Sequence, residues 1–264
     1  MRIVEIARDN ILEPCGLDLF NYQIDPYAGC AHHCVYCYTQ NDSPVDWKTE
    51  VGLSLRLAEK LDAELENIQP QTVYLGMNTD PYQPAEREAR QSRRVLEILE
   101  QRGFSVCILT KSDLVLRDVD LLGRMPGSSV GLSVAFARDD LRKVFEPDTI
   151  PVEARIEALA RLREAGIETY ALINPVVPFI TEVGAIIDLL SPHADTIWIY
   201  PLHMNSRDDA NWRSMRDALE RAFPEALGEV EGAAFDGQDA YWLNLREELL
   251  GAAPYLPVRL EICL

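Results

Sequence analysis

The sequence predicts an α/β fold in which about six strand–helix units build a parallel sheet. Short apolar, β-rich segments alternate with longer amphipathic segments from residue 22 to residue 222. The chain has 264 residues, which is enough for one sizeable core. It contains no apolar run of roughly eighteen residues, so we expect no membrane span.

The first units are predicted from local patterns. Residues 22–26 read as a short strand that leads into a loop with three cysteines. A helix is predicted over 52–66, because leucines recur there at helical spacing opposite a charged side. The apolar run 72–75 predicts the next strand. Residues 86–101 predict a helix that Gly103 ends, since glycine favours the turn after a helix.

The same alternation continues through the rest of the chain. The apolar run 104–110 predicts a strand, and Ser112 can cap a short helix that reaches residue 124. The β-rich run 129–136 predicts another strand, and a helix over 152–164 stops before a glycine. Further units follow the same patterns: strand 169–177, helix 181–190, strand 196–200 and helix 210–222.

The alternation breaks at residue 225. A helix is expected at 239–250, and a β-like run at 258–263. We interpret residues 1–224 as the core and 225–264 as an extension packed on that core. The chain is therefore predicted to be a single domain overall.

A cysteine-rich loop carries the strongest chemical signal. Cys30, Cys34 and Cys37 have the spacing CxxxCxxC. Three thiolates can hold three irons of a 4Fe–4S cluster, which leaves the fourth iron open for substrate or cofactor. A zinc site with His32 or His33 as fourth ligand is an alternative, although no second cysteine pair at a similar spacing is present. Disulfide pairing within the loop would leave an odd thiol.

The loop resembles the cluster loop of the radical SAM superfamily, with Tyr36 as the aromatic residue before the third cysteine. Residues 26–30 resemble more narrowly the branch that is similar to spore photoproduct lyase. The resemblance spans roughly residues 20–200. Three further segments support it: GMNTDPYQP at 76–84, TKS at 110–112 and NPVVP at 174–178.

The resemblance implies a partial (β/α)6 TIM-like barrel with a short C-terminal cap, which agrees with the six predicted units. It implies a 4Fe–4S cluster and S-adenosylmethionine (SAM), whose amino and carboxylate groups would chelate the open iron. Reductive cleavage of SAM would give a 5′-deoxyadenosyl radical that abstracts hydrogen from an unknown substrate. An external electron donor of flavodoxin or ferredoxin type is also implied.

Candidate site residues lie where predicted strands pass into loops, which is where barrels of this kind place their active groups. By resemblance, the adenine would lie near the backbone of Tyr36, and Lys111 would attract the cofactor carboxylate. Tyr38 matches a tyrosine of the radical relay in the lyase branch, so it is the candidate catalytic residue. The predicted cofactor-binding residues are Tyr36, Thr79, Asp80, Lys111, Ser133 and Asn174.

Each of these assignments has a structural alternative. Asp80 precedes a proline and could only start a turn. Lys111 could be a surface lysine, and Ser133 could occupy an ordinary pleat position. Asn174 could simply end a strand, and Tyr38 could pack at the barrel mouth.

Charge argues against broad nucleic-acid binding. The formal net charge is −18, from 43 acidic and 25 basic residues, whereas affinity for nucleic acid comes largely from Lys and Arg. In the lyase branch, a cysteine in this region donates a hydrogen atom to the product radical. Met77 stands in the matching place here and has no S–H. DNA photoproduct repair is thus an alternative reading, as is an iron–sulfur or zinc protein without turnover.

The remaining cysteines are not expected to bind the cluster. Cys15, Cys107 and Cys263 are isolated in the sequence, and Cys107 lies in an apolar run where it would be a small buried hydrophobe. The N-terminal residues lack the long apolar core of a signal peptide. Free cysteines and an iron–sulfur site fit a reducing compartment, so we expect a cytoplasmic protein.

Overall fold

The structure has the predicted α/β fold, built on a mostly parallel main sheet of eight strands. The computed structural model describes residues 1–264. Seven of the eight strands run parallel, and only the last in the order below is antiparallel to its neighbour. Across the sheet the strands are β11 (Arg259–Ile262), β10 (Thr196–Pro201), β9 (Glu168–Val176), β8 (Ser129–Ser133), β7 (Ser105–Thr110), β6 (Thr72–Leu75), β3 (Tyr22–Ile24) and β2 (Leu12–Pro14).

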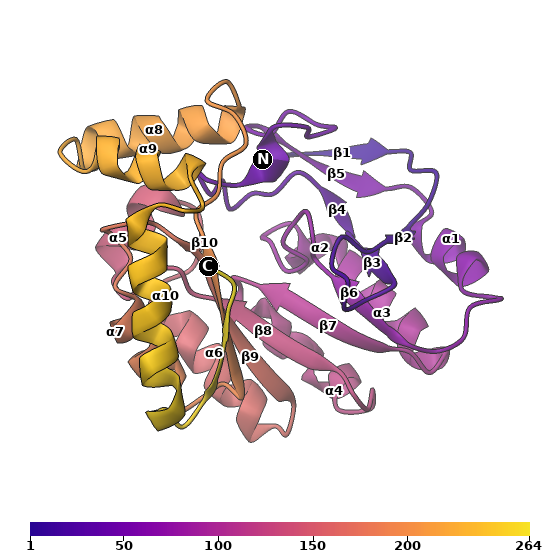
Figure 1. Cartoon of the computed structure of the whole chain (residues 1–264). Helices are drawn as coiled ribbons and strands as arrows, with labels where there is room; N and C mark the ends of the chain where they lie inside the picture. The colour runs from indigo at the N-terminus through magenta and orange to yellow at the C-terminus, as the bar shows by residue number, and fades with distance from the viewer.

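Helices connect the strands and cover one face of the sheet, which gives a partial barrel (Figure 1). Contacts between helix and strand confirm this cover: α3 packs on β7, α6 on β8 and β9, and α7 on β9. In chain order the helices are α1 (Leu57–Glu64), α2 (Glu86–Ala89), α3 (Gln91–Gln101), α4 (Val119–Leu122), α5 (Asp139–Phe145), α6 (Val152–Glu164), α7 (Val183–Leu190) and α8 (Ala210–Ala222).

The core lies between the helices and the strands because alternate strand residues point to opposite faces. The side chains that face the helices are apolar and fully buried: Val73, Leu75, Val106, Ile108, Val130, Leu132, Ala171, Ile173, Ile197 and Ile199. The residues between them, including Leu109, Ser133 and Asn174, point to the other face. That face is therefore free to carry the polar groups of a site.

One predicted helix is partly a strand. Residues Glu50–Ser54 form β5, which pairs with β1 (Arg2–Ile6) and β4 (Tyr27–Ala28) in a separate three-stranded sheet. A Cβ on Gly52 would lie 3.0 Å from an Ile6 side-chain carbon, so glycine allows the strands to approach closely. The prediction of a helix over 52–66 was therefore wrong before residue 57. The leucine spacing does not reveal a strand partner near the N-terminus.

Other boundaries differ from the predictions in smaller ways. Arg90, with a φ of 51°, divides the helix predicted at 86–101 into α2 and α3. The strand predicted at 129–136 ends at Ser133. The segment predicted as a helix at 112–124 is mainly a 3₁₀ helix, Asp113–Asp118, followed by α4. The sequence did not predict α5, which lies next to the candidate site.

The final segment joins the main sheet. It forms α9 (Leu227–Phe235), α10 (Ala240–Ala252) and β11. β11 pairs in parallel with β10, and α10 contacts both α9 and β11 (Figure 1). The division of the chain into 1–224 and 225–264 stays a prediction. None of the helices combines the length and apolar character needed to cross a bilayer.

Candidate active site

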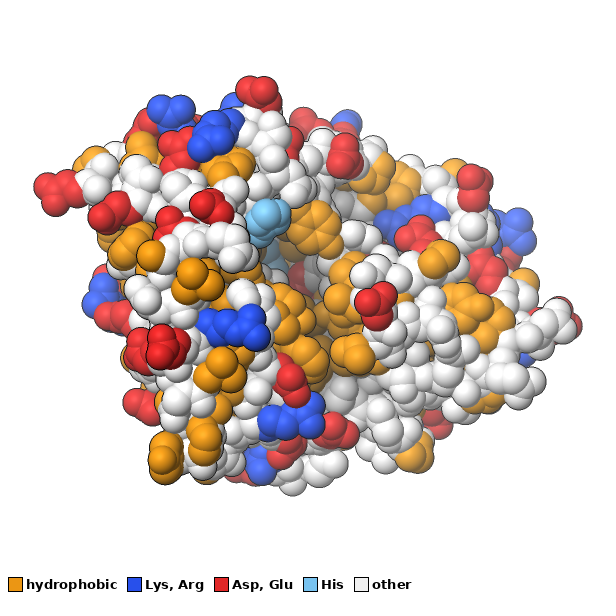
Figure 2. Space-filling view, viewed as in Figure 1, with side chains coloured by type: hydrophobic (Ala, Val, Ile, Leu, Met, Phe, Trp, Pro, Cys, Tyr) orange, Lys and Arg blue, Asp and Glu red, His pale blue; other side chains and the backbone are white.

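A cavity of about 240 Å³ opens where the parallel strands end, and Figure 2 shows a hollow at the centre of this face with a histidine near its rim. His203, which follows β10, belongs to the lining of this cavity. All ten predicted site residues line it as well: Cys30, Cys34, Cys37, Tyr36, Tyr38, Thr79, Asp80, Lys111, Ser133 and Asn174. The structure thus gathers the residues that the sequence selected, and their individual roles stay predictions.

The cysteine loop forms one wall of the cavity. Cys30 and Cys34 are buried, while Cys37 is partly exposed. Burial raises the pKa of the thiols of Cys34 and Cys37. A buried thiolate needs a cation or metal to stabilise it, and cysteine thiolates are the usual ligands of iron–sulfur clusters, so three cysteines on one loop suit such a cluster. Gly29 allows the sharp entry to the loop, because its φ is 72° and a Cβ there would meet the Glu50 carbonyl oxygen at 2.9 Å.

The two histidines of the loop do not complete a site for a single ion. His33 Nδ1 lies 2.7 Å from a carboxylate oxygen of Asp148, and His32 Nδ1 lies 3.3 Å from Asp80. Nowhere do three or more His, Cys, Asp or Glu side chains meet at a point that could hold one metal ion. Each histidine instead lies beside a carboxylate, His33 beside Asp148 and His32 beside Asp80.

Gln83 supports the cysteine loop through two hydrogen bonds to its backbone. Its side chain is fully buried, accepts a hydrogen bond from the Ala31 N–H at 3.0 Å and donates one to the Gly29 carbonyl at 3.0 Å. The Tyr27 hydroxyl, just before the loop, donates to the Glu86 carboxylate. Gln83 lies near the C-terminal end of the segment 76–84, which resembles a family motif. This segment therefore supports the cysteine loop, a role that the sequence did not reveal.

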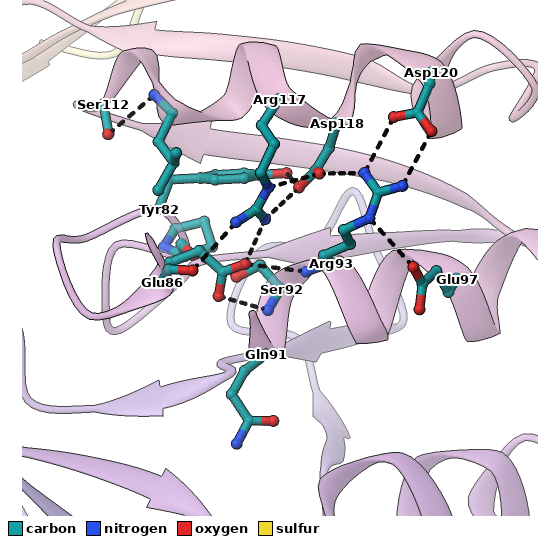
Figure 3. A network of polar contacts seen from close by, with 12 residues as sticks. Tyr82, Glu86, Gln91, Ser92, Arg93, Glu97, Ser112, Arg117, Asp118 and Asp120 are labelled. Atoms are coloured by element: carbon teal, nitrogen blue, oxygen red, sulfur yellow. Dashed lines mark hydrogen bonds and ion pairs between the residues drawn. The ribbon is translucent and has the colours of Figure 1, made fainter. Parts of the chain in front are cut away.

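Glu86 anchors a buried network of charges, drawn in Figure 3. Its carboxylate is fully buried, accepts the Ser92 N–H at 2.9 Å and lies 2.5 Å from Arg117 Nη2. Asp118 is also fully buried, and Arg93 and Arg117 each reach it at 2.7 Å. Two buried carboxylates and two arginines thus fix the start of α3 beneath the cysteine loop.

Asp80 organises the end of β7. Its carboxylate accepts hydrogen bonds from the Thr110 hydroxyl at 2.6 Å, the Lys111 N–H at 2.7 Å and the Tyr82 N–H at 2.8 Å. Burial alone would raise the pKa of Asp80, but the neighbouring His32 and these hydrogen bonds outweigh it and lower the pKa to about 2. Asp80 is therefore an ionised group whose oxygens are engaged by protein donors.

Asp25 supports the site and was missed by the sequence reasoning. It is buried at the end of β3, and its carboxylate accepts the N–H groups of Asn78 at 2.8 Å and Thr79 at 3.0 Å. It thereby shapes the loop after β6. The only sequence signal for Asp25 was its place at the end of a predicted strand.

Tyr38, which is 53% exposed, donates its hydroxyl to the Met77 carbonyl at 2.9 Å.

Lys111 is mostly buried in the cavity wall. Its side chain is 17% exposed, and its Nζ lies 3.9 Å from a Glu146 carboxylate oxygen and 5.8 Å from the centre of the Tyr36 ring. Burial disfavours the charged ammonium, but Cys34 and Glu146 outweigh this and raise its pKa. The alternative of a plain surface lysine does not fit this position.

Comparison with known proteins now decides the family. The model of the radical SAM superfamily matches residues 24–190. The chain belongs to the radical SAM superfamily. It is 30% identical over 227 residues to an uncharacterized protein of Methanocaldococcus jannaschii, covering 86% of this chain and 85% of that protein. It is 26% identical over 157 residues to the radical SAM Nalpha-GlyT isomerase of Pseudomonas phage M6, covering 58% and 33%.

Solved structures share the fold of this radical SAM protein. A spore photoproduct lyase variant with a dinucleoside spore photoproduct superposes with a TM-score of 0.64 at 14% identity, covering 84% of this chain and 66% of the lyase. Streptococcus suis SuiB bound to S-adenosylmethionine gives 0.58 at 12% identity, covering 91% and 49%. The chain thus spans about two thirds of the lyase length. These likenesses confirm the partial TIM-like barrel.

Membership in the superfamily implies a 4Fe–4S cluster, SAM and a source of electrons. A spore photoproduct lyase structure of the same fold contains bound AdoMet. The residues present here fit these groups, because three thiols and a buried ammonium line one cavity.

Proposed function

We propose that this radical SAM protein is an enzyme that cleaves SAM reductively and uses the resulting radical on a substrate other than DNA. The single observation that carries the proposal is the convergence of the three cysteines and the cationic Lys111 on one cavity at the strand ends. A cavity of this kind, with a few convergent polar groups, is typical of a cofactor and substrate site.

Different residues of the cavity would hold the cluster, bind SAM and pass on a hydrogen atom. Cys30, Cys34 and Cys37 would hold the cluster, and Lys111 would attract the carboxylate of SAM. When bound, the cluster would supply one electron and SAM the 5′-deoxyadenosyl moiety for radical chemistry on a hydrogen atom of the substrate. Tyr38 lies at the mouth of the cavity, where its phenol could pass a hydrogen atom.

Polar residues on three strand ends would complete the cofactor pocket. Ser133 ends β8, and Asn174 lies near the end of β9, and both line the cavity. Thr79 donates its hydroxyl to the Tyr27 carbonyl at 3.3 Å. Since Asp80 uses its oxygens on protein donors, we assign it to holding the turn at Lys111 in place.

Replacing Lys111 should weaken SAM binding. Lys111→Ala removes a charge-assisted contact worth about 1.5–3 kcal/mol, so the dissociation constant should rise roughly ten- to hundredfold. Anaerobic calorimetry on the cluster-loaded protein measures the change. Lys143→Ala is the matched control, since Lys143 is 68% exposed on α5 and does not line the cavity. Equal affinity in both variants would make Lys111 irrelevant to SAM.

The enzyme should not repair photoproduct in DNA. The net charge of −18 opposes phosphate contacts, and Met77 lines the cavity where the lyase branch uses a thiol. DNA binding should be no tighter than non-specific affinity, about 10⁻⁴–10⁻⁶ M, and strongly salt-dependent.

The test is anaerobic incubation of the loaded enzyme with SAM, a reductant and UV-irradiated thymine-rich DNA. We expect slow formation of 5′-deoxyadenosine without return of thymine. Recovery of thymine would establish the repair alternative, and a lack of any 5′-deoxyadenosine would favour an iron–sulfur or zinc protein without turnover.

A further inference from the structure

Glu146 is a buried carboxylate that connects the cysteine loop to the end of β7. It directly follows α5 and is fully buried. One of its oxygens accepts the Tyr36 hydroxyl and lies 3.9 Å from Lys111 Nζ. The other oxygen lies 2.7 Å from Arg155 Nη2. Glu146 thus contacts two of the predicted cofactor residues without lining the cavity itself.

Arg155 holds this carboxylate in one place. Its side chain is 1% exposed, and it donates to the Ser133 carbonyl at 2.9 Å, the Thr149 hydroxyl at 2.5 Å and the Ile150 carbonyl at 3.2 Å. These bonds tie the guanidinium to β8 and to the segment before α6. Because several hydrogen bonds hold Arg155 in place, its ion pair also holds the Glu146 carboxylate in one position. That position stays the same when the flexible Lys111 side chain moves.

The charges of this group do not cancel. Glu146 carries one negative charge, while Arg155 and Lys111 carry one positive charge each, so one positive charge remains. Lys111 lines the cavity together with Cys34, whereas Arg155 does not. The positive charge that remains is therefore the Lys111 ammonium, which shares the cavity with the cysteines.

We propose that Glu146 is a positioning residue that holds the Lys111 ammonium back from the cluster and offsets part of its charge, and thereby lowers the reduction potential of that cluster. The proposal rests on the proposed function, since it requires a cluster on Cys30, Cys34 and Cys37. Reduction adds a negative charge, which a nearby cation stabilises and a nearby anion destabilises. Glu146 and Lys111 should therefore shift the potential in opposite directions.

The experiment compares cluster-loaded Glu146→Gln and Lys111→Met proteins without SAM. Iron content is measured first, and the midpoint potential is then followed by electron paramagnetic resonance. Glu146→Gln should move the potential to more positive values, and Lys111→Met to more negative values, both with full iron content. Asp140→Asn is the control, because Asp140 is a 70% exposed acid of α5 that pairs with the exposed Arg138 and does not line the cavity. Its potential should equal that of the parent.

A double variant tests whether Glu146 acts through Lys111. If it does, Glu146→Gln should cause a different shift in the Lys111→Met background than in the parent, since coupled residues are not additive. Shifts of the same sign, or strictly additive shifts, would overturn the proposal. Should Glu146→Gln fail to hold the cluster, Glu146→Asp, which keeps the charge, should hold it at a potential near that of the parent.

Loss of iron from both Glu146 variants would show a purely structural role and would also overturn the inference. The parent protein separates this result from a failure of the proposed function. If the parent takes up a cluster and cleaves SAM while the variants show no shifts, only the role of Glu146 is wrong. If the parent takes up no cluster, both proposals fail.

Discussion

Replacing any one of Cys30, Cys34 and Cys37 with alanine should abolish cluster binding and, with it, all cleavage of SAM. The parent protein should hold about four irons per chain after anaerobic reconstitution, as a cubane with one open iron requires. With two thiolates left, a second iron lacks a ligand and the cluster should be lost. Iron analysis and the visible absorption spectrum measure the loss, and chromatography of 5′-deoxyadenosine measures activity.

The other cysteines supply matched controls for this experiment. Cys107 lies on β7 with its Sγ 3.4 Å from the Tyr170 hydroxyl, and Cys263 is exposed after β11. Neither lines the cavity. Cys107→Ala and Cys263→Ala should therefore keep the full iron content. If either variant loses the cluster, the assignment of three ligands is wrong.

Glu86→Ala should destabilise the protein by about 3–5 kcal/mol, because removal of one partner from a buried ion pair leaves the other charge uncompensated. Arg117 would lose one of its two carboxylates, and the hydroxyl of Tyr27 and the N–H of Ser92 would lose their acceptor. Urea unfolding measures the change. Since Tyr27 precedes the cysteine loop, the folded fraction should also bind less iron.

Glu88→Ala is the control for Glu86, because both residues lie in α2 and Glu88 is exposed. It should change the free energy of unfolding by no more than about 0.5 kcal/mol, as surface substitutions usually do. Equal unfolding midpoints for the two variants would mean that the network in Figure 3 contributes nothing to stability.

The strand–helix alternation was readable because it depends on local patterns. The helices at Val152–Glu164 and Ala210–Ala222 were predicted with their observed bounds, since their periodicity and ends are local in sequence. The prediction for 52–66 failed at its start because Leu53 belongs to a strand that pairs with residues near the N-terminus, although it continues the leucine spacing of the helix. Pairing across distant segments overrides local periodicity.

The sequence by itself determined the chemistry. The spacing of Cys30, Cys34 and Cys37 on one short loop indicated the cluster, and the strand ends indicated where the polar residues would meet. Each of these signals lies within a few neighbouring residues. For that reason the ten residues could be selected from the sequence and its family resemblance, and the structure places all of them in the lining of one cavity.

Only the tertiary structure decided how that site is held. Asp25 binds the loop after β6 across 53 positions of sequence, Tyr27 meets Glu86 across 59, and Tyr36 meets Glu146 across 110. A buried acid in such a contact looks in sequence like any other Asp or Glu, because its role depends on partners that the fold brings to it. The supporting carboxylates of this enzyme became visible only once the barrel had placed those partners together.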